Sequence, residues 1–321
     1  MKRSALRTGL RLSLAALGTA CAMSSASANG TLNALFAVDS NHSNIDVFDA
    51  THTLISTLHD GTNGNLEGLA VSSTGTVYVG GTSGKVDYFN ASGVLQGSIH
   101  QFGSEVTGIA TDKSGNVYVA TSDSIHKLNS SGTIIATYTS TVPGILEMYG
   151  VTVDKNGTVW GVSQTQGGAT VYKLNSSLGV IQTHFLAGGW ATANSIAVDN
   201  NGNLVIADRD IGRIHTVNTT TWSDTFYGST TGLSVAIDNN GVFGPLGALY
   251  VGQGAIRQVN ESNGAVLDTL NTPGQNIDAM AFGKFQAPGV PEPGSVALLM
   301  CSGAIGTSLM LRRRRAKNSG E

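Results

Sequence analysis

Six residues spaced regularly along the chain are the first candidates for chemistry. Each directly precedes a repeated apolar strand motif, and they are Glu67, Thr107, Tyr149, Asn194, Leu233 and Asp278. Three of them, Glu67, Asn194 and Asp278, carry the side-chain oxygens that hard cations such as Ca²⁺ prefer as ligands. They form a candidate metal or ligand site if the fold brings them together. The alternative is that these side chains cap strand ends or bind water.

Two further features could contact a ligand. Trp190 lies in the segment LAGGWATAN and could stack on a sugar ring, although pinning its loop is an equal alternative. Asp208, Arg209 and Asp210 form a local charge cluster that either contacts a polar ligand or pairs with itself on an exposed loop. The seven histidines lack zinc-binding spacing, and there is no Gly-x-Ser-x-Gly elbow. No catalytic residue is predicted.

The elements that must position these residues follow from an internal repeat. The motifs GLAVSSTGTVYVGG, GIATDKSGNVYVAT, GVTVDKNGTVWGVS, SIAVDNNGNLVIAD, SVAIDNN and AMAFGKF begin at residues 68, 108, 150, 195, 234 and 279, at spacings of 40, 42, 45, 39 and 45. A period of about 40 to 45 residues is typical of β-propellers. In each unit a short apolar strand, a tight turn and three further alternating segments predict four antiparallel strands, which make one blade.

The last unit stops after its first strand, and its missing strands are found at the start of the domain. Segments 32–40, 44–52 and 53–59 match strands two to four of the other units. We therefore predict an all-β fold, a six-bladed propeller whose last blade is completed by N-terminal strands. Ring closure removes the exposed sheet edges that a linear array would leave. It would place Asp278 beside Glu67, with Asn194 across the channel.

The blade pattern, apolar-Ala-Val-Asp-x-x-Gly-Asn-Val-Tyr-Val-Ala, resembles that of NHL-repeat and gluconolactonase-like six-bladed propellers. In gluconolactonase-like enzymes a Glu, an Asn and an Asp hold a divalent metal near the channel mouth. The resemblance implies that Glu67 and Asn194 take two of these roles. Leu233 stands where the family has the Asp of the fifth blade, so the implied ligand set is incomplete. The architecture hosts many functions and specifies none.

The N-terminus has the order of a secretory signal. Four basic residues precede the apolar run LSLAALGTACAM and the small residues Ala26-Ser27-Ala28, which predicts a signal peptide over 1–28. The run is too short to span a bilayer, which needs about 20 residues. A lipoprotein signal at Cys21 is the alternative, but Gly18 stands where a lipobox has a large aliphatic residue.

The C-terminus carries a second export feature over 288–321. Val290, Pro291, Glu292 and Pro293 precede an apolar stretch from Val296 to Leu311 and then a basic cluster of Arg312, Arg313, Arg314 and Arg315. Physically this is a short transmembrane helix with a cytoplasmic stop. The order resembles the PEP-CTERM sorting signal, which implies recognition and removal by an exosortase-type protease in a Gram-negative-like bacterium. An ordinary C-terminal anchor is the alternative.

Charge and cysteine content limit what the domain over 29–287 can do. Both cysteines, Cys21 and Cys301, lie in the end segments, so no disulfide or thiolate metal site is expected in the domain. The domain holds nine Lys and Arg against nineteen Asp and Glu, and an acidic surface repels phosphate backbones. No nucleic acid is therefore expected, and the only membrane contact expected is through the tail.

Two functions from different classes remain open. The first is an exported, non-enzymatic surface or matrix protein that binds extracellular polysaccharide or another envelope component. The second is a divalent-metal-dependent lactonase-like hydrolase or lyase acting outside the cytoplasm, motivated by Glu67, Asn194 and Asp278. The incomplete ligand set favours the first, and no cofactor other than a divalent cation such as Ca²⁺ is suggested.

Overall fold

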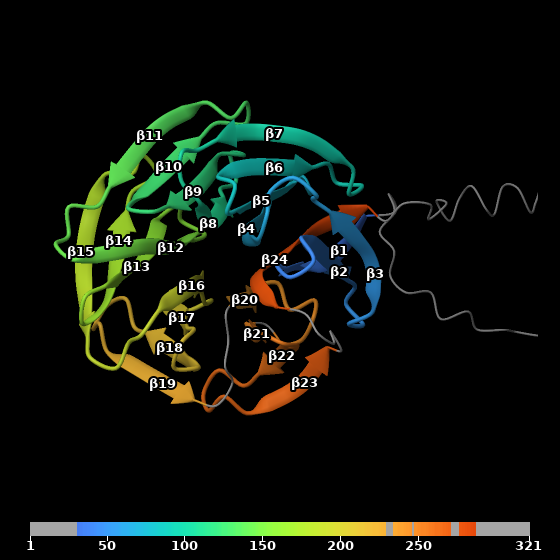
Figure 1. Cartoon of the computed structure of the whole chain (residues 1–321). Coiled ribbons are helices and arrows are strands. Elements are labelled where there is room, and N and C mark those ends of the chain that lie inside the picture. Colours follow the sequence, from blue (N-terminus) through green and yellow to red (C-terminus); the bar gives the residue numbers. More distant parts are fainter. Residues whose placement is uncertain (1–30, 229–233, 246, 271–275, 287–321) are drawn as a thin grey trace, which may run out of the picture.

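The described residues form six antiparallel sheets around a central channel. The computed structural model describes residues 31–228, 234–245, 247–270 and 276–286. In these residues 24 strands make six four-stranded blades, which confirms the predicted six-bladed propeller (Figure 1). The predicted signal peptide and sorting tail lie outside the described residues. Within the described part there is no helix long and apolar enough to cross a membrane.

The four strands of each blade run in order from the channel to the rim. Blade 1 consists of β4 (Leu66–Val71), β5 (Val77–Gly81), β6 (Lys85–Phe89) and β7 (Leu95–Gln101). Blade 2 consists of β8 (Val106–Thr111), β9 (Val117–Thr121), β10 (Ser124–Leu128) and β11 (Ile134–Thr139). Blade 3 consists of β12 (Ile145–Val153), β13 (Val159–Thr165), β14 (Gly168–Leu174) and β15 (Val180–Ala187).

The second half of the ring continues the pattern, and its last blade joins the first and last strands of the propeller. Blade 4 consists of β16 (Ala193–Val198), β17 (Leu204–Asp208), β18 (Arg213–Val217) and β19 (Asp224–Gly228). Blade 5 consists of β20 (Ser234–Asp238), β21 (Ala248–Gly252), β22 (Ile256–Val259) and β23 (Val266–Leu270). Blade 6 consists of β24 (Ile277–Gln286), β1 (Thr31–Asp39), β2 (Asn44–Phe48) and β3 (Leu54–His59). The prediction that N-terminal strands complete the last blade is thus confirmed.

Aspartate turns connect the first two strands of a blade. In blade 2, Asp112 Oδ1 accepts hydrogen bonds from the amides of Ser114 and Asn116, each at 2.9 Å. Gly115 takes a φ of +80° there, a conformation that glycine adopts without steric cost. The hydrogen bonds of this Asp-x-x-Gly motif are therefore those of a tight turn.

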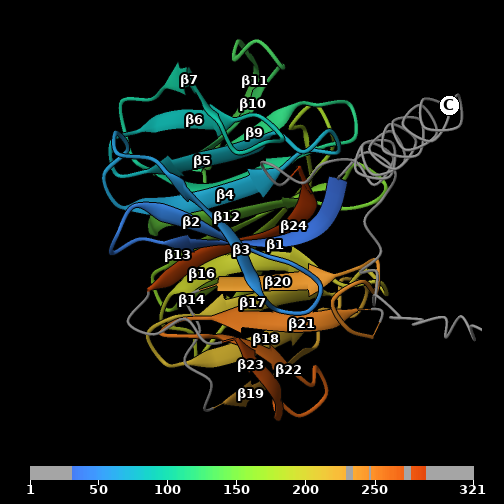
Figure 2. The same ribbon diagram turned by 90° about the vertical axis from the view of Figure 1, so that its right-hand side faces the viewer.

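Apolar clusters fill all six seams between neighbouring blades. The sheets stack face to face around the axis, as the side view also shows (Figure 2). Close approach of the innermost strands explains the glycine that opens several of the repeated motifs. A Cβ at Gly108, for example, would lie 2.8 Å from the carbonyl oxygen of Tyr149 in the next blade. This packing holds the ends of the inner strands around one channel.

Candidate functional site at the channel mouth

A β-bulge recurs in the innermost strand of five blades, at the position predicted to face the channel. In blade 1, for example, Leu66 pairs with Gly81 and Gly68 pairs with Gly80, so Glu67 is left without a partner strand residue. The residues bulged in this way are Glu67, Thr107, Tyr149, Asn194 and Asp278. A bulge redirects a side chain out of the regular strand alternation. The sixth predicted position, Leu233, lies outside the described residues.

All five bulged residues line one cavity, which has a volume of about 570 Å³. The cavity follows the innermost strands from these residues to the turns at the other end, where Lys113 and Lys155 line it. Its size falls in the range of about 300 to 1,000 Å³ that is usual for small-molecule sites. The predicted residues Glu67, Asn194 and Asp278 therefore line the same cavity.

A pair of glutamates lies at this mouth. Burial, the neighbouring Glu105 carboxyl and the charges of Asp278 and Glu147 raise the pKa of Glu67 from 4.5 to about 8. Two carboxylates in contact cannot both be ionised without strong repulsion. Burial and the Glu105 contact therefore favour the protonated form of Glu67 at neutral pH.

Sequence reasoning missed Glu105 and Glu147. They stand two residues before the ring residues Thr107 and Tyr149: Glu105 directly precedes β8, and Glu147 is the third residue of β12. The signal that could have found them is a polar residue two positions before each ring residue. In five of the repeats this position holds Asn65, Glu105, Glu147, Thr192 and Asn276. Comparing the repeats two residues further upstream would have found it.

Tyr149 and Arg209 form the other charged part of the mouth. The Arg209 guanidinium carbon lies 5.8 Å from the centre of the Tyr149 ring, within cation–π range. Burial and the neighbouring Glu147 raise the pKa of Tyr149 to about 12, so its hydroxyl remains a hydrogen-bond donor. Burial also raises the pKa of Glu147, while its contact with Tyr149 and the charge of Arg209 act in the opposite direction. This side of the mouth thus offers a phenol, a carboxyl and a cation.

The remaining ring residues differ in how available they are. The Asn276 amide nitrogen lies 3.2 Å from both carboxyl oxygens of Asp278, and burial raises the pKa of that aspartate. The hydroxyl of Thr107 is buried and donates to the carbonyl of Met148 at 2.6 Å. Thr107 therefore acts as a strand-end cap, the role that the sequence left open for the whole ring.

Trp190 does not lie open at the mouth. It is only 9% exposed, belongs to the apolar cluster between blades 3 and 4, and stacks on His215 with the ring centres 3.7 Å apart. Such burial leaves little of the indole face for a sugar ring. The structure thus favours the loop-pinning alternative over ligand stacking.

The charge cluster at 208–210 has a buried part, Asp208, and an exposed self-paired part, Arg209 with Asp210. Asp208 is fully buried and accepts hydrogen bonds from the amides of Ala191 and Thr192, both at 2.8 Å. Arg209 does pair with Asp210, at 3.2 Å, but its guanidinium extends over Tyr149. The cluster thereby anchors the loop before β16 and supplies a cation to the mouth.

Of the candidate metal ligands Glu67, Asn194 and Asp278, only Glu67 and Asp278 carry carboxyl groups. In the residues that the structure describes, no three His, Cys, Asp or Glu side chains are grouped so that they could hold a metal ion. The Leu233 side chain carries no oxygen that could serve as a ligand. We therefore derive no chemical step through a metal.

Comparison with known proteins identifies the fold and nothing finer. No protein-family model and no curated protein matches the chain. A crystal structure of a protein of unknown function from Bacteroides caccae matches with a TM-score of 0.62 and 15% identity, over 78% of this chain and 98% of that one. The structure of a streptogramin B lyase matches with a TM-score of 0.58 and 15% identity, over 79% and 87%. At this identity the two structures show a shared β-propeller fold only.

Proposed function

We propose that this chain is an exported binding protein that takes an uncharged or cationic, hydroxyl-rich ligand, such as a segment of extracellular polysaccharide, at the channel mouth. The observation that carries the proposal is the convergence of five bulged residues on one cavity of about 570 Å³. A repeated distortion directed at a cavity is expected of a binding site, since bulges accumulate next to functional sites.

The side chains at the mouth match hydroxyl groups better than anions. A protonated carboxyl, an amide and a phenol each donate and accept hydrogen bonds, as sugar hydroxyls do. Glu67, Asn194 and Tyr149 provide these three groups around the cavity. The carboxyl groups outnumber Arg209 there, so uronate polymers and nucleic acids would meet a like-charged mouth. The expected ligand is consequently a neutral or amino sugar.

Export is part of the proposal and is supported by the two ends of the sequence. The basic, apolar and small-residue order of residues 1–28 and the Val-Pro-Glu-Pro tail suit a protein processed at the envelope. An exosortase-type protease is the proposed partner for the tail. Mass spectrometry of the protein recovered from its native envelope should find an N-terminus at Asn29 and loss of the chain after the region 290–293.

Binding can be tested with glycan arrays of known charge. Residues 29–287 are expected to retain neutral or chitosan-type oligosaccharides and not alginate oligosaccharides. Asn194→Ala and Tyr149→Ala should each weaken binding by about tenfold, since one lost hydrogen bond of about 1.4 kcal/mol has that effect. Ser131→Ala, in an exposed turn of blade 2, is the matched control. Selective retention of alginate, or equal binding by all variants, would contradict the proposal.

A second candidate function is a lyase or hydrolase, favoured by one observation. Glu67 is held protonated near neutral pH, which is what a general acid requires. One structural neighbour is itself named a lyase, although the similarity extends only to the fold. Loss of lactone or glycan cleavage in Glu67→Gln, with ligand binding retained, would support this candidate over binding alone.

The metal-dependent version of the enzyme can be tested separately. Because no group of three ligating side chains is found in the described residues, we expect the thermal melting temperature to be unchanged by EDTA or by added Ca²⁺. Metal analysis of protein purified without chelator should likewise find no stoichiometric divalent ion. A bound ion and a melt that EDTA lowers would restore the metal-dependent hydrolase.

A further inference from the structure

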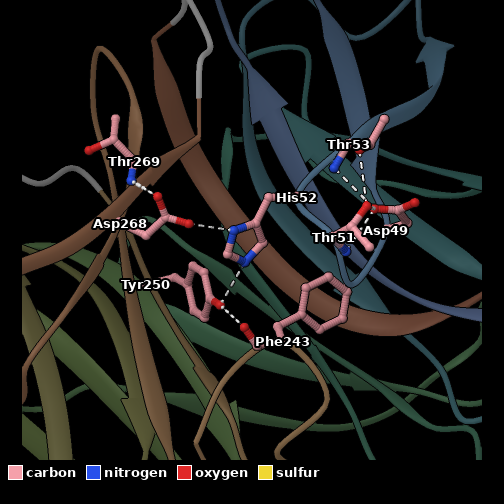
Figure 3. A network of polar contacts seen from close by, with 8 residues as sticks. All are labelled: Asp49, Thr51, His52, Thr53, Phe243, Tyr250, Asp268 and Thr269. Atoms are coloured by element: carbon pink, nitrogen blue, oxygen red, sulfur yellow. Dashed lines mark hydrogen bonds and ion pairs between the residues drawn. The ribbon is translucent and has the colours of Figure 1, made fainter.

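The seam between blades 5 and 6 is held by a polar contact far from the channel (Figure 3). Blade 6 contains both ends of the propeller, so its hairpin β2–β3 has no short covalent link to blade 5. The turn of this hairpin places His52 against blade 5, where it contacts Asp268 of β23 and Tyr250 of β21. His52 also lies parallel to the Phe243 ring, at 6.4 Å between ring centres.

His52 occupies a backbone position that favours glycine. Its φ is +61°, and its amide donates to Asp49 O in the same way that Gly93 and Gly132 bond in the equivalent turns of blades 1 and 2. A histidine there carries a strain cost that glycine avoids. The side chain it supplies makes the contacts to blade 5 that glycine could not.

The contacts of His52 indicate which of its ring nitrogens carry hydrogens. Tyr250 has one hydroxyl hydrogen, and its oxygen lies 2.6 Å from the carbonyl oxygen of Phe243, to which it donates. The Tyr250 oxygen can then only accept from His52 Nε2, at 3.1 Å. Asp268 Oδ2, at 2.8 Å from Nδ1, is an acceptor as well. With Tyr250 donating to Phe243, both ring nitrogens are placed to donate, which only the imidazolium form can do.

We propose that His52 is held as the imidazolium and that this seam is a proton-dependent clamp, closed when His52 is charged and weakened when it loses a proton. In the neutral ring one nitrogen has only a lone pair. Tyr250 would then either face that lone pair with its own, or turn its hydrogen to the ring and leave the Phe243 carbonyl unpaired. Either outcome removes one hydrogen bond from the seam.

The charged and titratable groups around His52 favour its charged form. The Thr269 amide and then the His52 contact lower the pKa of Asp268, so this carboxylate stays ionised beside the ring. Asp49 also attracts the imidazolium, and its own hydrogen bonds to Thr51 and Thr53 keep it ionised. Burial raises the pKa of Tyr250, so that its hydroxyl keeps the single hydrogen. The clamp is accordingly complete only while Asp268 is ionised and both ring nitrogens of His52 carry protons.

The direct test is the protonation state of His52. In ¹⁵N–¹H correlation spectra of the mature protein at pH 6, both ring nitrogens of His52 should carry protons. The signal can be assigned by its loss in His52→Asn, since asparagine tolerates positive φ. A single protonated ring nitrogen at pH 6 would overturn the proposal.

Thermal melting gives the second readout. From pH 6 to pH 9 the wild type should lose about 4 °C more in melting temperature than His52→Asn, because a hydrogen bond involving a charged group is lost. Asp268→Asn should remove the same pH-dependent part, and the double variant should add little to either. His59→Gln, a histidine of the same blade that contacts Asn44, is the matched control and should melt like the wild type. Equal pH dependence of the wild type and His52→Asn would also overturn the clamp.

Discussion

Replacing Phe36 by alanine is expected to lower the free energy of unfolding by about 3 to 5 kcal/mol, the usual cost of removing a buried aromatic ring. Phe36 is fully buried in β1 and packs edge-on against Phe285 of β24, at 5.8 Å between ring centres. These two strands join the ends of the chain along nine paired residues. The substitution therefore weakens ring closure itself, and urea denaturation of residues 29–287 measures the effect.

The matched control is Phe226→Ala. Phe226 lies on the outer strand β19 and is 54% exposed, so its loss should cost less than about 1 kcal/mol. A cost at Phe36 no larger than at Phe226 would mean that the closing blade contributes little to the stability of the ring. The comparison thus tests the closure mechanism rather than aromatic packing in general.

Glu67→Gln is expected to stabilise the protein at alkaline pH and to change little at pH 4. The pKa of Glu67 is about 8 in the folded state against 4.5 for an ordinary glutamate. A raised pKa means that folding favours the protonated form, so the wild type loses stability as pH rises from about 4.5 to 8. Glutamine does not titrate and avoids this loss.

The size and the check of this effect follow from the same shift. Each pKa unit corresponds to about 1.4 kcal/mol, and after allowing for solvent screening and for the contact with Glu105 we expect a gain of about 2 kcal/mol at pH 9. Melting curves between pH 4 and pH 9 measure it. Asp123→Asn, in an exposed turn of blade 2, is the control and should give no such gain. A constant difference between wild type and Glu67→Gln at all pH values would show that Glu67 does not hold a proton.

This expected gain bears on function. Two neighbouring carboxyl groups that lower the stability of the fold at neutral pH are not explained by a structural role. Functional sites commonly lower stability in this way. If Glu67→Gln is more stable at alkaline pH and also loses ligand binding, the mouth is a site that trades stability for recognition. If only stability changes, the acid pair has no role in binding.

Much of the fold could be predicted because its signals are local. Strands and turns are encoded by patterns of two to five consecutive residues. These patterns recur at a fixed period, so aligning the sequence with itself predicts the number of blades and the closure of the ring. The same repeat located the ring of Glu67, Thr107, Tyr149, Asn194 and Asp278, because equivalent positions in a closed ring face the same axis. Aspartate turns such as that of Asp112 were predicted for the same reason.

The direction, contacts and burial of the side chains at those positions depend on the tertiary structure. Side chains at a bulge leave the two-residue alternation, so their direction into the cavity cannot be read from the strand pattern. The contacts of Glu67 with Glu105, of Arg209 with Tyr149 and of Trp190 with His215 join blades or loops distant in the chain, and each depends on how neighbouring sheets pack. By itself the sequence determined the propeller and the ring of candidate positions, since these follow from local pattern and symmetry. Protonation, burial and the clamp at His52 depend on contacts between distant segments, which exist only once the ring has closed.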